Sequence, residues 1–338
     1  MALFLDRKTT LRAAQAGARA LHAMARPDGV FLYRYHYGSR DPMPPHYNAL
    51  RHFGAVWAML DVASGAEDLK PAAEAAHRAA QRGLASFVKP FGVEDRLCVV
   101  DAGKIKLGGN GLALVAFEKA VELFPDSSLR AACPALGAFI LSQQRADGDF
   151  IHTRQYPIGV ELEFRSNYYT GQALLGLFCA SALTGDPRYR EAALLSLTGL
   201  AARDYGVEER SHWMMYALER AVATSDDARW RDLARKIATK IVGMPETEWR
   251  LEAAPLACNA EALVVWNRIS EASADPADQD LRPLAKRVLR RILRKLLALQ
   301  TRDGGFRASA SNAEIRIDYV QHAISALIGY ARQPSLCD

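Results

Sequence analysis

No stretch of this sequence is apolar over the roughly 18 residues that a membrane-spanning helix requires. Near the start, Asp6 and Arg7 interrupt the chain before an apolar run of signal-peptide length can form. These two absences predict a soluble, cytoplasmic protein without a transmembrane segment. Of the 338 residues, 50% are hydrophobic, which suffices for the core of an ordered chain with one large domain or two smaller ones. The helical hairpins described below favour a single domain over residues 1–338.

Cysteine is also scarce. The five cysteines are scattered without any C-x-x-C spacing, and their odd number argues against a disulfide framework, so we interpret them as free thiols. A phosphate-binding loop and a dinucleotide-binding fingerprint are missing as well, and Gly108, Gly109 and Gly171 are interpreted as sites of tight turns or close helix contacts. No cofactor is therefore predicted.

The excess of positive charge is small. A net charge of +5 is mild for this length and does not indicate nucleic-acid binding. One segment departs from this average, because residues 286–300, "KRVLRRILRKLLALQ", are strongly basic and amphipathic. This segment either forms the solvated face of a helix or contacts a membrane surface or an acidic protein partner.

Helical periodicity, by contrast, is abundant. Apolar residues recur about every 3.6 positions in a series of segments that group into six pairs, which predicts an all-α chain of helical hairpins. The predicted helices span residues 10–25, 47–63, 70–88, 108–123, 127–145, 167–184, 187–203, 211–224, 227–242, 257–272, 281–301 and 317–332.

The two helices of a predicted pair differ in where their polar residues lie. One kind, such as residues 69–88, carries charges on a broad face, as expected of a helix half exposed to water. The other kind, such as residues 166–185, is apolar along most of its length but begins with polar residues. A helix that is apolar on all sides must be buried on all sides. We therefore predict an (α/α)6 toroid with six inner and six outer helices.

The polar starts of the inner helices predict a shared site. If these helices run parallel around the ring, their N-terminal ends meet at one face and form a bowl. The longer links enter the inner helices, and their Asp-Gly pairs and alternating patterns predict short β-hairpins on the same face. The links in question are "RPDGVFLYRY", "RADGDFIHTRQYPIGVELEFRS" and "TRDGGFRASASNAEIRID". They are expected to wall the bowl.

Motifs at the starts of the inner helices carry a resemblance to known proteins. The motifs are "YNALRH", "KLGGN", "YYTGQALL", "HWMMYAL" and "RIDYVQH", a set that resembles one bacterial family. The chain as a whole, over about residues 10–332, resembles the six-hairpin toroid proteins. These include sugar epimerases of the N-acylglucosamine epimerase type, unsaturated glucuronyl hydrolases and other six-hairpin glycosidases. The resemblance implies a carbohydrate-active enzyme.

A second resemblance is limited to two loops. "LSQQRADGDF" and "LALQTRDGGF" are similar to the Gln-x-x-x-Gly-aromatic repeats of terpenoid cyclases and protein prenyltransferases. The Asp-x-Asp-Asp acid of the cyclases is missing, and Asp226 and Asp227 fall on a short link away from the predicted bowl. Terpenoid chemistry is therefore a minor alternative.

The predicted bowl combines aromatic and hydrogen-bonding side chains. Such a mixture suits a sugar, whose ring faces stack on aromatic residues while its hydroxyl groups bond polar ones. Arginine, lysine and the helix N-termini add positive potential, which predicts an anionic small-molecule or oligosaccharide substrate such as a uronate or a phosphorylated sugar. The predicted substrate-binding residues are Tyr47, Asn48, Arg51, Lys106, Asn110, Glu163, Tyr168, Tyr169, Gln172, Trp213, Tyr216, Arg316 and Gln321.

Two kinds of catalysis are open at such a site. A glycoside hydrolase needs two carboxyl groups, for which we favour Asp318 and Glu261, whereas an epimerase or lyase needs a base such as His52, His212 or His322. Asp318 could instead cap a helix, and His52 and His322 could be buried structural histidines. Hydrolysis is the first prediction, and a toroid that binds a peptide or saccharide without catalysis is the alternative from another class.

Zinc is a further alternative. Cys258 and His322, together with His212 or Asp318, could form a tetrahedral site like the zinc site that prenyltransferases hold in a similar toroid. Because no H-x-x-x-H or C-x-x-C spacing supports it, no metal ligands are predicted.

The spacing in "RIDYVQH" yields a specific geometric prediction. Residues three and four positions apart share one face of a helix, so Asp318, Gln321 and His322 should face the bowl together. Arg316 would then lie in the entering loop, where it could pair with Asp318 or bind an anionic substrate. A merely structural helix start would show Asp318 bonded to the backbone of the first turn and His322 buried against an outer helix.

Overall fold

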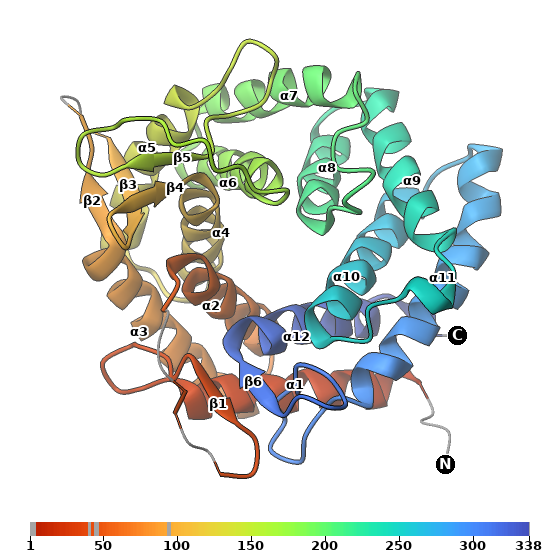
Figure 1. Ribbon diagram of the computed structural model, residues 1–338. Coiled ribbons are helices and arrows are strands. Elements are labelled where there is room, and N and C mark those ends of the chain that lie inside the picture. Colours follow the sequence, from red (N-terminus) through yellow and green to blue (C-terminus); the bar gives the residue numbers. More distant parts are fainter. Residues whose placement is uncertain (1–4, 40–41, 44–46, 93–95, 338) are drawn as a thin grey trace.

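The computed structural model describes residues 5–39, 42–43, 47–92 and 96–337, so residues 1–4 and 338 of the predicted domain lie outside the described residues. The chain forms a ring in which one set of helices lies inside another, which confirms the predicted all-α (α/α)6 toroid (Figure 1). In the described ranges the inner helices are α2 (Ala49–Ala63), α4 (Leu107–Leu123), α6 (Tyr169–Thr184), α8 (His212–Thr224), α10 (Ala253–Ser270) and α12 (Ile317–Ala331). The outer helices are α1 (Arg7–Met24), α3 (Lys70–Phe87), α5 (Ser127–Ser142), α7 (Pro187–Ala201), α9 (Ala228–Val242) and α11 (Pro276–Leu297).

The helix starts differ between the two rings. Except for α3, the outer helices are preceded by an aspartate whose carboxylate accepts hydrogen bonds from backbone N–H groups, as Asp126 does from Ser128 and Leu129 at the start of α5. Among the described inner helices, α4, α6, α10 and α12 have no side chain that bonds the first turn. The free N–H groups and the positive ends of these helix dipoles therefore face the bowl.

Short strands lie on the bowl face of the ring. β1 (Arg34–His36) pairs antiparallel with β6 (Glu314–Arg316), with Arg34 opposite Arg316. A four-stranded antiparallel sheet has the order β2 (Val88–Pro90), β3 (Leu97–Asp101), β4 (Lys104–Lys106) and β5 (Thr153–Gln155). Three of the strands fall in loops predicted to form hairpins, but they pair between loops, so that the walls of the bowl are joined around the ring.

The repeated Gln-x-x-x-Gly-aromatic loops have a packing role. Nε2 of Gln144 donates to Ala192 O (3.0 Å) on the next outer helix, and Nε2 of Gln300 donates to Ala13 O (2.9 Å) in the same way. Gly304 has φ +88°, and a Cβ on it would lie 2.2 Å from a backbone oxygen of α1. The loops therefore bind consecutive outer helices together, and glycine is required where they touch.

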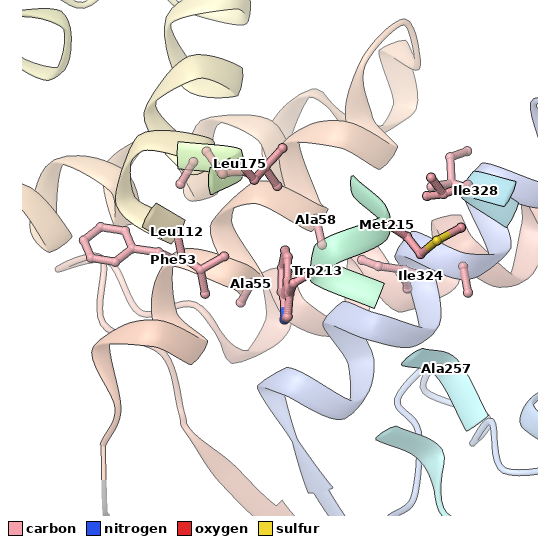
Figure 2. Packing of buried hydrophobic residues seen from close by; sticks show 14 of the residues in the cluster. Phe53, Ala55, Ala58, Leu112, Leu175, Trp213, Met215, Ala257, Ile324 and Ile328 are labelled. Atoms are coloured by element: carbon pink, nitrogen blue, oxygen red, sulfur yellow. The ribbon is translucent and has the colours of Figure 1, made fainter. Parts of the chain in front are cut away.

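Apolar side chains of the inner helices fill the middle of the ring (Figure 2). Phe53 and Ile324 pack outward against Gly83 of α3 and Gly17 of α1, and Leu112, Leu175 and Trp213 are buried next to the cavities of the ring. The last three side chains separate the cavity at the N-terminal ends of the inner helices from a second cavity, of about 620 Å³, whose lining includes Asp61, Glu219 and Arg332. The described residues that line the two cavities do not overlap.

The basic segment at 286–300 lies largely on α11. Lys286 donates to Ser335 O (2.9 Å) and Arg290 to Leu5 O (3.2 Å), so that this helix holds the two ends of the described chain. Arg291 pairs with Glu246 at 3.1 Å. Among the described residues, no helix combines the length and the apolar character that crossing a bilayer would need.

Candidate active site

A cavity of about 340 Å³ lies at the N-terminal ends of the inner helices, and all six of these helices or the residues that lead into them contribute to it. Many of the residues predicted from the sequence line it: Asn48, Arg51, Tyr168, Tyr169, Gln172, His212, Trp213, Asp318, Gln321 and His322. Residues that the sequence did not indicate as substrate-binding also line it: Leu50, Leu112, Ser166, Ala254 and Cys258.

Asp318 is held by two arginines. Its Oδ1 accepts from Nε of Arg316 (2.5 Å) and its Oδ2 from Nη2 of the same residue (2.9 Å). Arg51 Nε lies 3.0 Å from Oδ2 of Asp318, and its Nη1 donates to the hydroxyl group of Tyr33. The carboxylate therefore does not cap α12, whose N-cap position is Arg316. Both oxygens of this buried carboxylate are thus engaged in charge-assisted hydrogen bonds or ion pairs with arginine.

His322 is the centre of a hydrogen-bonded chain behind the cavity. Its Nδ1 lies 2.7 Å from Oε2 of Glu261, and Oε1 of Glu261 accepts from the hydroxyl group of Tyr216 at 3.0 Å. Nδ1 also lies 3.2 Å from Nε2 of Gln321. Because Nδ1 is taken up by these contacts, Nε2 is the ring nitrogen that remains for other partners. Burial lowers the pKa of His322, but Cys258 and Glu261 together raise that pKa well above the usual value for histidine.

His212 lies next to His322 at the same side of the cavity. The two imidazole rings meet edge to face with their centroids 5.0 Å apart, and Trp213 lies beside them. His212 is 1% exposed, and its Nε2 has no hydrogen-bond partner among the described residues. Burial, and then the neighbouring His322, hold the pKa of His212 well below its usual value. An imidazole in this setting is neutral and has a nitrogen free for a ligand.

Glu261 and Cys258 share one face of α10, since they are three positions apart. Glu261 is fully buried, and burial raises its pKa against the opposing effects of His322 and Tyr216. Cys258 is half-buried and lines the cavity. Burial raises the pKa of its thiol, while the contact with His322 opposes this rise.

His52 lies on the opposite side of α2 from the cavity. Its Nε2 is 2.8 Å from Ala79 O on the outer helix α3, and its Nδ1 is 2.7 Å from the hydroxyl group of Tyr47. The ring is fully buried among Phe31, Phe53 and Phe87. The structure therefore gives His52 and Tyr47 a packing role, because both ring nitrogens are already bonded away from the site.

Five other predicted binding residues also lie outside the cavity lining: Lys106, Asn110, Glu163, Tyr216 and Arg316, which pairs with Asp318. Asn110 is buried, with its Oδ1 accepting from Val99 N (2.8 Å), and Lys106 pairs with Asp101 at 2.6 Å. Glu163 is exposed on the loop before α6. Tyr216 reaches Glu261 from the far side and borders the second cavity.

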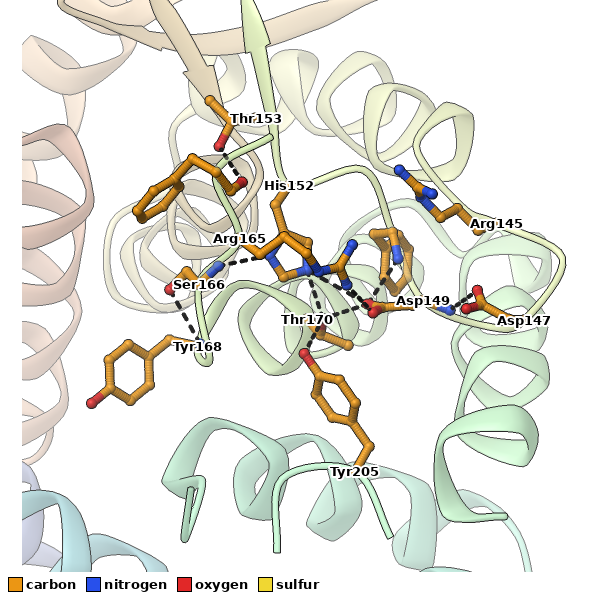
Figure 3. A network of polar contacts seen from close by, with 12 residues as sticks. Arg145, Asp147, Asp149, His152, Thr153, Arg165, Ser166, Tyr168, Thr170 and Tyr205 are labelled. Atoms are coloured by element: carbon orange, nitrogen blue, oxygen red, sulfur yellow. Dashed lines mark hydrogen bonds and ion pairs between the residues drawn. The ribbon is translucent and has the colours of Figure 1, made fainter. Parts of the chain in front are cut away.

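A polar network that the sequence did not indicate supports one rim of the cavity (Figure 3). Asp149 is buried and accepts from Thr170 Oγ1 (2.7 Å) and from Arg165, and Nδ1 of His152 accepts from Ser166 N (2.9 Å). Burial raises the pKa of Asp149, but hydrogen bonds from His152 and Thr170 hold that pKa well below its usual range. The network fixes the segment that leads from Arg165 to the rim residue Tyr168. The one sequence signal that could have revealed this network is the "ADGDF" motif, which contains Asp149.

No known protein family and no curated protein matches this sequence. Solved structures do match it over almost its whole length. D-mannose isomerase matches with a TM-score of 0.70 at 12% identity, covering 95% of this chain and 97% of that one. The chain has the six-hairpin toroid fold. An unsaturated glucuronyl hydrolase specific for heparin matches with a TM-score of 0.64 at 14% identity, with coverages of 96% and 97%.

Cellobiose 2-epimerase from Bacillus thermoamylovorans matches this toroid with a TM-score of 0.68 at 10% identity, with coverages of 95% and 99%. Identities this low show a common fold alone. Since hydrolases and isomerases share this toroid, the fold does not select a reaction, and the chemistry must be argued from the residues of the site.

Proposed function

We propose that this protein is a carbohydrate-active enzyme that isomerises or epimerises a small sugar by proton transfer, with His212 and His322 as its catalytic residues. The observation that carries the proposal is the meeting of the two imidazole rings, 5.0 Å apart, in one cavity. Moving a proton next to a carbonyl group needs a base and an acid within reach of adjacent substrate atoms. D-mannose isomerase and cellobiose 2-epimerase, which share the fold, are named for reactions of this class.

In the proposed reaction, Nε2 of His212 takes the proton from the carbon next to the carbonyl group. The electron pair of the broken C–H bond forms the double bond of an enediol, and the carbonyl oxygen takes a proton from His322. When a proton returns to the former carbonyl carbon, the neighbouring hydroxyl group becomes the new carbonyl by giving its proton to His322, and the product is an isomer. When a proton instead returns to the other face of the first carbon, the former carbonyl oxygen gives its proton back to His322, and the product is an epimer. Glu261 is a positioning residue in this scheme, because it contacts the imidazole of His322 from behind the cavity.

The rest of the cavity suits a sugar of one or two rings. Its volume of about 340 Å³ is near the lower end of small-molecule sites, which are roughly 300–1,000 Å³. Trp213 and Tyr168 offer aromatic surfaces for the apolar face of a sugar ring. Oε1 of Gln172 is buried and has no hydrogen-bond partner among the described residues, so a sugar hydroxyl group could donate to it.

Glycoside hydrolysis, the first prediction from the sequence, has less support in this geometry. Of the described residues that line the cavity, Asp318 is the one carboxylate, whereas hydrolysis requires two carboxyl groups, and both oxygens of Asp318 are already bonded to arginine side chains. Glu261 does not belong to the lining. We keep an anionic substrate in the proposal. Arg51 and Arg316 carry two positive charges and Asp318 carries one negative charge, so these three side chains together have a net charge of +1.

Deuterium incorporation tests the proposal. We expect the purified protein, incubated in D2O with a panel of aldoses, ketoses and hexuronates, to introduce deuterium next to the carbonyl group of at least one sugar. His212→Asn and His322→Asn should each lower this rate by roughly 10²-fold or more, and His36→Asn, an exposed histidine on β1, is the matched control. Release of new reducing ends from glycosides without deuterium incorporation would favour hydrolysis instead. Sugar binding without turnover would favour a non-catalytic toroid.

A further inference from the structure

Four metal-binding side chains meet at one side of the cavity. His212, Cys258, Glu261 and His322 each offer one donor atom, and these atoms all lie within 4.8 Å of one another. They come from the three consecutive inner helices α8, α10 and α12, which lie next to one another in the ring (Figure 1). The rigid scaffold rather than a flexible loop therefore fixes their spacing.

An independent observation points to a ligand at the same place. Nε2 of His212 is buried, and nothing in the described part of the chain bonds it. A buried polar nitrogen without a partner is unfavourable unless a group from outside the chain completes its bonding. The neighbouring Cys258 and His322 border the same space.

We propose that His212, Cys258 and His322 bind a divalent transition metal of the zinc type, with Glu261 orienting His322 and a fourth coordination position open to the cavity. The three proposed ligands line the cavity, whereas Glu261 stands behind His322 and bonds its Nδ1 at 2.7 Å. A carboxylate that holds one imidazole nitrogen while the other binds the metal is a recurrent support of zinc sites.

The donor set selects the class of metal. Two imidazole nitrogens and a thiolate suit Zn²⁺ and similar ions, which form tetrahedral sites, while Mg²⁺ and Ca²⁺ prefer sites built of oxygen ligands. Charge agrees with this choice, because the thiolate of Cys258 and the buried carboxylate of Glu261 would together balance a divalent cation. Three protein ligands with one open position is the arrangement of zinc sites that also bind a small molecule.

The metal site and the proposed proton transfer exclude each other at His212. A metal on Nε2 uses the lone pair that would take the substrate proton, so the metal-loaded protein should lack deuterium exchange and the metal-free protein should have it. The metal proposal itself depends on the donor set and not on the proposed reaction, and it can be tested without any sugar.

Cobalt titration tests the site, since Co²⁺ in a thiolate-containing tetrahedral site has intense visible bands and a thiolate-to-cobalt charge-transfer band. The full-length protein is first treated with a chelator and a thiol reductant and then titrated anaerobically with CoCl2. We expect one equivalent to bind with both spectral features and Zn²⁺ to displace it. Cys258→Ser should abolish the charge-transfer band, His212→Ala should weaken Co²⁺ binding at least tenfold, and Glu261→Gln should weaken it by about 10- to 100-fold.

Cys337→Ser is the matched control, because Cys337 is also half-buried but lies in the short helix α13 (Pro334–Cys337) outside the cluster. Circular dichroism and melting temperature of each variant show whether it is folded. The proposal would be overturned if Co²⁺ bound with only weak, octahedral-type bands. It would also be overturned if Cys258→Ser and His212→Ala both left Co²⁺ binding unchanged. Should chelator-treated, metal-free protein fail to exchange deuterium while Co²⁺ binds as expected, the metal site stands and the proposed reaction falls.

Discussion

Oε2 of Glu261 lies 2.7 Å from Nδ1 of His322, and Glu261 itself is fully buried. The pair therefore fixes the orientation of an imidazole that borders the cavity. Glu261→Gln keeps the shape but removes the charge that holds His322. In the metal-free protein we expect kcat for deuterium exchange to fall by roughly 10²-fold while KM changes little, because the substrate does not contact Glu261.

Glu122→Gln is the control for that variant, since Glu122 is exposed and pairs with Lys119. Its kinetics should equal those of the wild type. An unchanged kcat in Glu261→Gln, together with a large fall in melting temperature, would show that Glu261 has only a structural role.

Asp318→Asn should change the preference for charged sugars. With Asp318 ionised, its group with Arg51 and Arg316 has a net charge of +1, and removing the carboxylate charge raises this to +2. We expect a hexuronate to bind about five- to tenfold more tightly relative to a neutral hexose, as measured by calorimetric titration. Asp101→Asn, which removes the partner of Lys106 outside the cavity lining, should leave the preference unchanged. Equal effects of both substitutions would contradict a role of Asp318 in charge selection.

His52 should make the stability of the protein depend on pH. Burial lowers the pKa of His52 from 6.5 to about 4. The hydrogen bond to Ala79 O raises this pKa, while the positive charge of Arg82 lowers it further. The unfolded chain therefore binds this proton at a higher pH than the folded chain does. The stabilisation is complete above about pH 6.5 and is lost as the pH falls towards 4, by at most roughly 3 kcal/mol.

Urea unfolding of the wild type and of His52→Asn between pH 4 and pH 7.5 measures this dependence. Tyr47 is the other titratable group in contact with the ring, and burial raises its pKa far above this range. The variant should be less stable at neutral pH and should lose less stability on acidification. Parallel pH profiles for the two proteins would mean that other groups cause the acid sensitivity.

Gly304→Ala should be more destabilising than Gly185→Ala. Both glycines have positive φ, +88° and +75°, so alanine is strained at both positions by about 1–2 kcal/mol. At Gly304 the new Cβ would lie 2.2 Å from Ala16 O, whereas at Gly185 no atom of the described residues would lie within 4 Å of it. The difference in unfolding free energy between the two variants isolates the contact between the loop and α1. Equal destabilisation would show that the loop moves to relieve the clash.

Helical periodicity was sufficient to predict the ring from the sequence, because every buried face of a helix must be apolar along its whole length. The segment at 167–184, for example, is apolar on every side, and α6 is buried along nearly its whole length. The spacing of Asp318, Gln321 and His322 likewise placed three side chains on one face of α12, and all three line the cavity. Such regularities are local, so they can be predicted without knowledge of the partners.

The sequence could not resolve features that depend on contacts between distant segments. His52 and His322 both sit near the polar start of an inner helix, yet one turns towards α3 and the other towards the cavity. Shifting a residue by one position along a helix turns its side chain by about 100° around the helix axis. The apolar periodicity of a sequence does not determine the direction of a single side chain to this accuracy. The sequence offered a site at Cys258, His322 and His212 only as an alternative and could not choose it over Asp318, because no local spacing joins residues on different helices.

The pairing of β1 with β6, together with the bond from Arg7 to Ala331 O (3.2 Å), joins segments that are about three hundred positions apart. Arg316 and Asp318 are thus placed only when the two ends of the ring have met. A nascent chain on the ribosome could form its early hairpins one by one, but it would have no complete cavity until α12 had emerged and docked on α1. Long-range pairing of this kind slows folding, so the assembly of the cavity should coincide with the last and slowest step of ring closure.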